Sequence, residues 1–162
     1  MYYILSLITA PRVMVHELSH YLFCLLARVR VYKVKLFQFG QLAGYVEHDE
    51  PENFNQAFLI SFGPLIINTA AAMILFSQLR PPYHYLQLLY LWLGIVIGLH
   101  AIPSSGDARA LFDTANNKIK KNPFVIFGYP FVLILYILNI FKRLHIDIVY
   151  VGVLFYLARF YL

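Results

Sequence analysis

The chain has 162 residues, of which 60% are hydrophobic and 13% are charged, compared with roughly 25% charged in a typical soluble domain. This composition predicts an integral membrane protein and argues against an ordinary soluble domain. The net charge of +5 does not indicate nucleic-acid binding, because the basic residues stand in short clusters between apolar runs, where membrane proteins carry their topology signals. A single cysteine, Cys24, excludes an intramolecular disulfide framework and a CxxC metal site.

Five apolar stretches follow one another along the chain, and most are close to the ~20 residues that a membrane-spanning helix needs. They cover residues 2–27, 57–79, 83–102, 123–141 and 146–162. We therefore expect an all-α polytopic membrane protein with about five transmembrane helices, folded as a single domain over residues 1–162. The polar segment SSGDARALFDTANNKIKKN is interpreted as a break between the third and fourth spans.

The basic residues are distributed unequally over the connecting segments. If all five stretches cross the membrane, one side holds Arg28, Arg30, Lys33, Lys35, Arg109, Lys118, Lys120, Lys121 and Arg159, and the other holds Arg80, Lys142 and Arg143. Cytoplasmic loops of membrane proteins carry the excess of lysine and arginine. The multi-pass chain is therefore expected to have its N-terminus outside and its C-terminus in the cytoplasm.

The segment between the first two spans, VYKVKLFQFGQLAGYVEHDEPENF, has the pattern of strands. Tyr32, Val34 and Leu36 alternate with Lys33 and Lys35, and glycines interrupt the segment. It predicts one or two short strands that form a small membrane-associated β segment, because unpaired strand edges cannot face lipid. Residues 35–46 could pair with an extended substrate by strand addition, or serve as a structural plug over the site.

The motif HELSH interrupts the first apolar stretch. A helix places His16 and His20 one turn apart on one face, so that both imidazoles can reach one zinc ion. Glu17 lies beside the metal without being a ligand, where it can act as general base and acid in peptide hydrolysis. Ionisable side chains inside a membrane helix each cost ~2.5–3.5 kcal/mol, and a metal site would compensate for this cost. Arg12, one turn earlier, could snorkel, pair with an acid or contact substrate.

A catalytic zinc usually has three protein ligands and one open position. Asp107 is the best third ligand, because it directly follows the third apolar stretch, where Pro103 and Gly106 would break the helix and turn the carboxylate back toward the metal. His100 is an alternative ligand, a group that hydrogen-bonds substrate, or a buried histidine satisfied by a neighbouring helix.

Four segments in this order resemble the landmarks of the site-2 protease family of intramembrane zinc proteases: HELSH, FGQLAGYVEHDE, SFGPLIIN and HAIPSSGDA. The resemblance covers about residues 1–115, and the two additional helices over residues 123–162 contribute nothing specific to it. It implies one Zn²⁺ per chain held by His16, His20 and Asp107, with Glu17 as the catalytic base. The implied substrate is a transmembrane helix of another membrane protein, cut within the lipid bilayer.

The chain departs from the family pattern at three positions. Ser19 stands where the family usually has glycine. The family's NxxP motif appears here as HAIP, so His100 takes the place of the asparagine, and Asp107 comes one residue earlier than the family's aspartate. Asn68 lies one residue further from the GP pair than in the family. Asp107 is still expected to bind zinc, and His100 and Asn68 are candidates for orienting substrate or stabilising the oxyanion.

Two other functions are compatible with the motif. One is a membrane protease in which a glutamate on a later helix completes the zinc site, although no glutamate follows Glu52. The other is a membrane protein that binds zinc or a partner without catalysis, which the intact Glu17 argues against. The expected function is a zinc-dependent intramembrane endopeptidase.

Overall fold

The computed structural model describes residues 2–38, 44–82, 84–119, 123–142 and 144–161. These ranges are mostly helical and include one small sheet, as predicted. The elements are α1 (Tyr2–Leu26), β1 (Val31–Lys35), β2 (Tyr45–His48), α2 (Phe54–Ser77), α3 (Tyr85–Gly98), α4 (Ser105–Ile119), the 3-10 helix η1 (Pro123–Gly128), α5 (Tyr129–Lys142) and α6 (Ile146–Tyr161).

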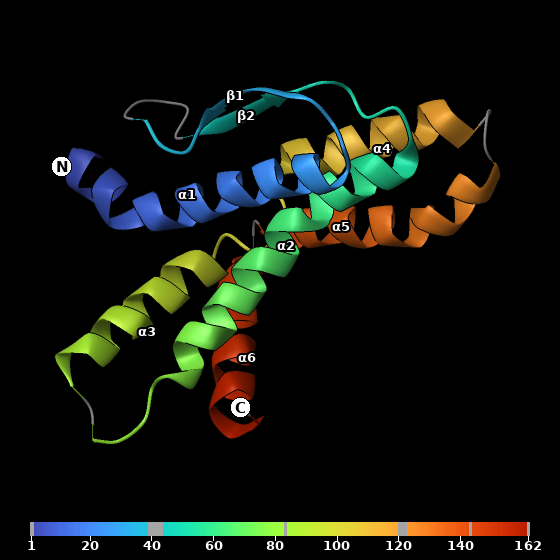
Figure 1. Cartoon of the computed structure of the whole chain (residues 1–162). Coiled ribbons are helices and arrows are strands. Elements are labelled where there is room, and N and C mark those ends of the chain that lie inside the picture. Colours follow the sequence, from blue (N-terminus) through green and yellow to red (C-terminus); the bar gives the residue numbers. More distant parts are fainter. Residues whose placement is uncertain (1, 39–43, 83, 120–122, 143, 162) are drawn as a thin grey trace.

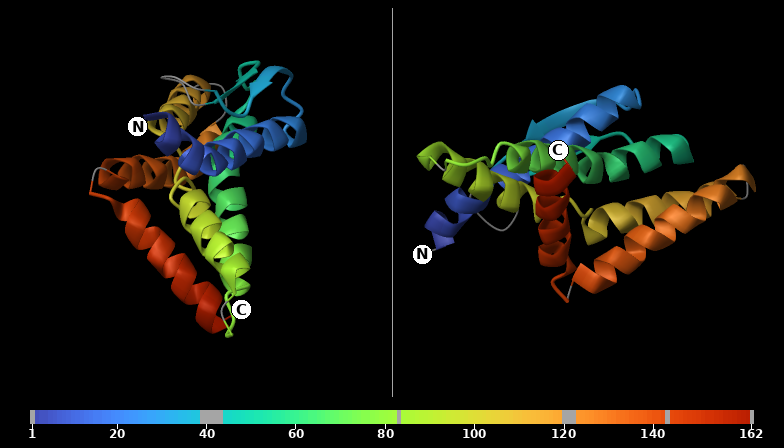
Figure 2. Two further views of the ribbon diagram at one scale, coloured as in Figure 1. Left: turned by 90° about the vertical axis from the view of Figure 1, so that its left-hand side faces the viewer. Right: turned by 90° about the horizontal axis from the view of Figure 1, so that it is seen from below.

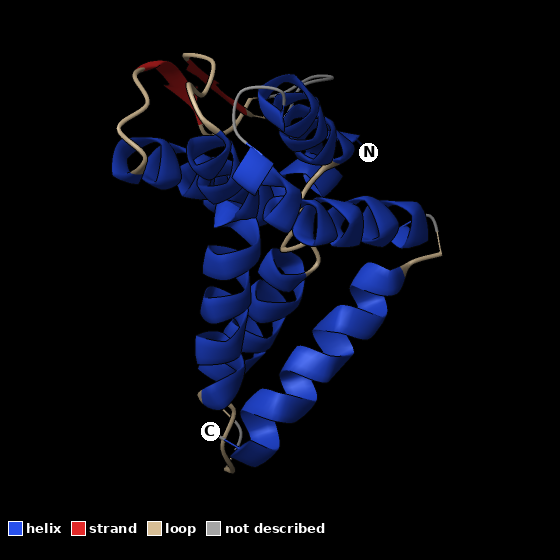
Figure 3. Cartoon of the chain, turned by 90° about the vertical axis from the view of Figure 1, so that its right-hand side faces the viewer, coloured by secondary structure: helices blue, strands red, loops and turns tan. Residues whose placement is uncertain are grey.

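The helix α2 is the centre of the fold, because it packs against α1, α3, α4 and α6 (Figure 1). The strands β1 and β2 pair as an antiparallel hairpin that rests on α1. The sheet lies at one edge of the molecule, above the helices (Figure 3). The helices α4 and α5 run side by side and project together from the centre (Figure 2). This arrangement brings α1, α2 and the start of α4 close together.

Of three apolar clusters of described residues that include α2, one joins it to α1 around Cys24 and Ile60, and two join it to helices that follow it in the chain. One of these two joins α2 to α4 and α5 around Ala57, Leu111 and Leu135, and the other joins it to α6 around Phe76 and Leu154. The close approach of α3 to the cluster shared with α6 requires a glycine, since a Cβ atom at Gly94 would lie 2.5 Å from Cε1 of Phe76. The last two helices, α5 and α6, are therefore each packed against α2 through an apolar cluster.

The helix α4 was not expected from the sequence. The prediction of a break over this segment was wrong, because its polar composition conceals a narrow apolar stripe. Ala108, Leu111 and Ala115 recur at helical spacing and are buried in the cluster shared with α2 and α5. The chain breaks earlier, over residues 99–104, and Gly106 lies in the first turn of α4 rather than in the break.

The helix lengths do not establish five membrane spans. Among the described residues, one helix, α2, is long and apolar enough to cross a membrane. The helices α3 and α5 are apolar but have only 14 residues each. At ~1.5 Å per residue such a helix is about 21 Å long, shorter than a hydrocarbon core of ~30 Å. The predicted polytopic arrangement is therefore not confirmed by the structure.

Candidate metal centre

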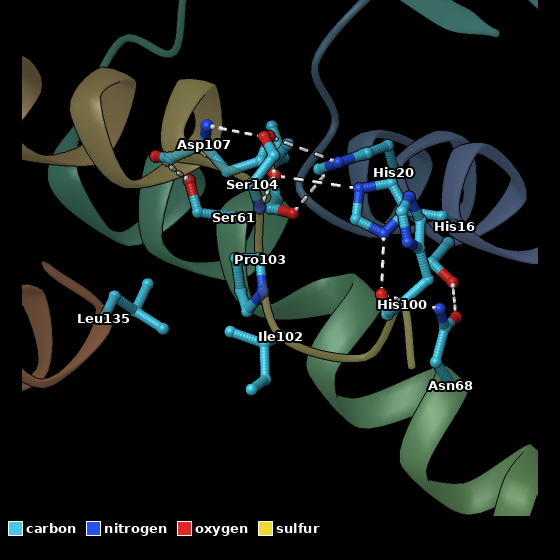
Figure 4. A network of polar contacts seen from close by, with 12 residues as sticks. His16, His20, Ser61, Asn68, His100, Ile102, Pro103, Ser104, Asp107 and Leu135 are labelled. Atoms are coloured by element: carbon cyan, nitrogen blue, oxygen red, sulfur yellow. Dashed lines mark hydrogen bonds and ion pairs between the residues drawn. The ribbon is translucent and has the colours of Figure 1, made fainter. Parts of the chain in front are cut away.

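The two motif histidines lie one turn apart in α1, as their spacing predicts. His16 and His20 are 5% and 8% exposed, and their ring centroids are 4.9 Å apart. Both side chains point toward the start of α4 (Figure 4). The helix thus buries two imidazoles on one face, where they can share a ligand.

Asp107 reaches the same point from the first turn of α4. Its carboxylate Oδ1 lies 3.3 Å from Nε2 of His20, and Oδ2 lies 3.7 Å from Nε2 of His16. One ligand atom from each of the three residues lies within 4.8 Å of the others. The structure therefore brings together the three residues that the sequence proposed as metal ligands, from segments almost ninety positions apart.

Backbone carbonyls set the protonation of both imidazoles. Nδ1 of His16 lies 3.1 Å from the carbonyl oxygen of His100, and Nδ1 of His20 lies 3.1 Å from that of Ile60. A carbonyl only accepts, so each Nδ1 carries the proton and each Nε2 keeps a lone pair for a metal. The Ile60 carbonyl is free for this role because its usual helical partner is Pro64, which has no N–H group.

A helix cap positions the third ligand. Ser104 precedes α4, and its backbone N–H and Oγ donate to Oδ2 of Asp107 at 2.8 and 2.7 Å, while the Asp107 N–H donates to Ser104 Oγ at 3.2 Å. This reciprocal pair resembles a capping box and fixes the carboxylate against the helix start. The two donors of Ser104 favour the ionised form of the Asp107 carboxylate. The ligand is thus ionised, as metal binding requires.

The donor set fits zinc. Two imidazole nitrogens and one carboxylate form a three-ligand set with an open fourth position, which is typical of catalytic zinc. At tetrahedral angles and bond lengths of ~2.0–2.2 Å, neighbouring ligand atoms lie about 3.3–3.6 Å apart. The two measured separations, 3.3 and 3.7 Å, are close to this range. Supporting hydrogen bonds on all three ligands complete the arrangement that metal sites need.

A cavity of about 410 Å³ opens beside the three ligands. It lies between α1, β2, α2 and α4, and its lining includes Glu17. The half-buried Glu17 therefore faces the same space as the ligands without being one of them. The cavity thus combines the Glu17 carboxylate, the three candidate metal ligands and space for a bound molecule.

Comparison with known proteins agrees with this geometry. Residues 9–116, more than half of the chain, match the family described as "Putative zincin peptidase". The chain belongs to this zincin family. Membership supports a zinc-dependent peptidase and does not single out the site-2 protease family. His16, His20 and Asp107 lie close together and could hold the metal ion. No curated protein and no solved structure matches the chain.

The zincin places His100 and Asn68 differently with respect to the cavity. His100 is among the residues that line the cavity, and its ring lies 5.1 Å from the His16 ring, centroid to centroid. Asn68 is fully buried, and its Nδ2 donates to the His100 carbonyl at 3.0 Å, the same carbonyl that holds His16. Ser19 Oγ donates to Asn68 Oδ1 at 3.3 Å. Asn68 thus helps to fix the His100 carbonyl that orients His16, one of the candidate zinc ligands. A contact between the His100 ring and substrate stays a prediction.

Other residues at the site were missed by sequence reasoning. His48 of β2 and Thr114 of α4 also line the cavity, whereas Tyr45 belongs to residues 35–46, which were predicted to pair with substrate or to cover the site. The serine three residues before Asp107 is a recognisable cap signal, and it could have revealed the start of α4. The contribution of His48 had no such signal, because it depends on how the hairpin folds back over α1.

Proposed function

We propose that this zincin is an intramembrane endopeptidase that hydrolyses a peptide bond within a transmembrane segment of another protein, in the manner of the site-2 protease family. The observation that carries the proposal is the convergence of His16, His20 and Asp107 beside a cavity that also contains Glu17. The ordered resemblance of the four sequence landmarks to that family is the second support.

The chemistry follows from the positions of the side chains. A bound zinc ion supplies Lewis acidity toward the carbonyl that is attacked. Glu17 accepts a proton from the attacking water and later delivers it to the leaving amine. The carbonyls of His100 and Ile60 keep the two imidazoles in one tautomer throughout, so the ligands need no rearrangement.

Exposed apolar surface supports a location in the membrane. The outer faces of α5 and α6 present large apolar side chains to the surroundings, among them Leu133, Ile134, Ile148, Val153 and Phe160. Soluble monomers rarely expose contiguous apolar patches of this kind. We propose a multi-pass chain. Its short helices would be accommodated by local thinning of the bilayer. The orientation with the N-terminus outside and the C-terminus in the cytoplasm stays a prediction, because it assigned Arg109 and Lys142 to opposite sides of the membrane, whereas both border one cavity in the structure.

The strand β2 is the proposed contact for the unwound substrate. Tyr45, Val46 and His48 border the cavity next to the metal ligands. A transmembrane helix hides its carbonyls and must become extended before attack, and an extended chain can pair with a strand edge. Residues 39–43 of the segment predicted to pair with substrate lie outside the described residues. The alternative role for the hairpin is a cover over the site.

Changing Gly44 to alanine is expected to lower the cleavage rate by about 10- to 100-fold while zinc stays bound. An added Cβ would lie 2.8 and 3.0 Å from the carbonyl oxygens of Leu36 and Lys35, and 2.9 Å from Cγ of Glu17. The hairpin or the Glu17 side chain would have to move. Steady-state cleavage and zinc content of the purified variant measure the effect. Gly152→Ala on α6, where a Cβ meets nothing within 4 Å, is the control. Unchanged cleavage in Gly44→Ala would contradict the close packing of the β1–β2 hairpin against the side chain of Glu17.

Cleavage in a defined bilayer tests the function. The purified protein is placed in liposomes with single-span substrates, and the products are located by mass spectrometry. We expect zinc-dependent cuts inside the spanning segment, and co-purification of intact substrate with Glu17→Ala in membranes. Cuts only in soluble peptides would indicate a zincin of another type, and zinc binding without cleavage would favour a non-catalytic role.

A further inference from the structure

The break between α3 and α4 connects two parts of the metal centre. At one end the His100 carbonyl accepts from His16, and at the other Ser104 holds the carboxylate of Asp107. Between them Ile102 and Pro103 are almost fully buried. The position of this segment, residues 100–104, therefore sets the distance between a histidine ligand and the aspartate ligand.

Two side chains of α5 bind successive carbonyls of this segment. Nδ2 of Asn139 donates to the carbonyl oxygens of Pro103 and Ser104 at 2.9 and 3.3 Å, with a longer contact of 3.4 Å to Leu135 in its own helix. Nζ of Lys142, one turn later, donates to the carbonyl of Ile102 at 3.1 Å. These donors satisfy the carbonyls of Ile102 and Pro103, which lie outside regular secondary structure, and add a second partner to the Ser104 carbonyl, which also accepts from the Ala108 N–H at 3.1 Å.

The polar side of this contact is open. Asn139 and Lys142 both border a second cavity of about 790 Å³ between α4 and α5. The hydrogen bonds therefore add to the apolar packing of Ile102 and Pro103 in holding the segment. The apolar helix α5 is an unfavourable place for the Asn139 amide, and its contacts with the segment compensate for that placement. Lys142 lies in the last turn of α5, where a cation is favourable.

We propose that Asn139 and Lys142 are positioning residues of the metal centre, which act by clamping the segment from Ile102 to Ser104. The family match ends at residue 116, so both residues lie outside it. The matched region would then not form a full-affinity metal site without α5. This inference rests on zinc binding by His16, His20 and Asp107 and does not depend on cleavage within a membrane.

The test is the zinc affinity of the full-length protein in detergent, measured by competition with a chelator. Asn139→Ala removes the amide donor, and Asn139→Asp replaces it by an acceptor. Lys142→Met removes the ammonium group, whereas Lys142→Arg keeps a charged donor. Asn117→Ala, an exposed asparagine on α4, is the matched control. We expect zinc to bind about 10- to 100-fold more weakly in the Asn139 variants, as for the loss of other supporting partners of metal ligands. Lys142→Met should weaken binding in the same direction and Lys142→Arg should restore it.

Two further measurements separate positioning from stability. The visible spectrum of the cobalt-substituted protein should change in Asn139→Asp, because the ligand geometry changes, and should not change in Asn117→Ala. The melting temperature of the zinc-free protein reports stability alone. Unchanged zinc affinity and cobalt spectrum in both Asn139 variants and in Lys142→Met would overturn the proposal, even if the zinc-free protein melts earlier. If the Asn139 variants do not fold, the comparison of Lys142→Met with Lys142→Arg decides. Failure of the wild type to cleave peptides would count against the proposed function and leave these affinities interpretable.

Discussion

Replacing Glu17 by glutamine is expected to lower the rate of peptide-bond cleavage by about 10²- to 10⁴-fold, the usual contribution of general acid–base catalysis. Glutamine keeps the shape of the side chain in the cavity but cannot accept the proton of the attacking water. Zinc should remain bound at one ion per chain, because the three proposed ligands are His16, His20 and Asp107.

Single-turnover cleavage and zinc analysis of the same preparation measure this effect. Glu50→Gln, which changes an exposed glutamate outside the cavity lining, is the control and should cleave like the wild type. Normal cleavage by Glu17→Gln would eliminate Glu17 as the base. Loss of zinc in this variant would show instead that Glu17 contributes to metal binding.

Replacing Asp107 by asparagine is expected to abolish both stoichiometric zinc and cleavage. Asparagine has almost the same size, but it lacks the charge that balances the metal. The loss of affinity should exceed the ~10- to 100-fold that removal of a supporting partner causes. The stabilisation by zinc should decrease in parallel, since a ligand at 100 times its Kd adds about 2.7 kcal/mol to the free energy of unfolding.

Thermal melts with and without added zinc, together with metal analysis, measure this prediction. Asp113→Asn, at an exposed position on the same helix, should leave the zinc-induced shift in melting temperature unchanged. A full zinc-induced shift in Asp107→Asn would mean that another group is the third ligand. His100, which lines the same cavity, would then be the first residue to examine.

Part of the site could be predicted from sequence because it depends on local geometry. The spacing of His16 and His20 puts them on one face of any helix, and the helix forms as expected. The alternation around Val34 likewise predicted strands, and β1 and β2 form a hairpin there. The choice of Asp107 relied on its place after an apolar stretch and on a family resemblance. The 3.3 Å approach of Asp107 to His20 agrees with that choice.

Other features could not be predicted because they depend on contacts between distant segments. The polar residues of α4 suggested a break, and only its burial against α2 and α5 explains why it is a helix. Asn68 was a candidate for substrate contact, but α2 turns it toward the His100 carbonyl. The two C-terminal helices carried no recognisable motif, yet Asn139 and Lys142 contact the segment that precedes Asp107.

The sequence by itself determined the helical class, the placement of His16 and His20 on one helix face with Glu17 beside them, and the expectation of a zinc metallopeptidase, because these depend on composition and on spacing within one helix. The tertiary structure decided which carbonyls orient the imidazoles, how Ser104 fixes Asp107, and that α5 contacts the ligand-bearing segment. Hydrogen bonds between residues such as His16 and His100, 84 positions apart, leave no periodic trace in a sequence. They arise only when α2 has brought the separate helices together, which is why the motif was visible first and its supporting contacts only in the folded chain.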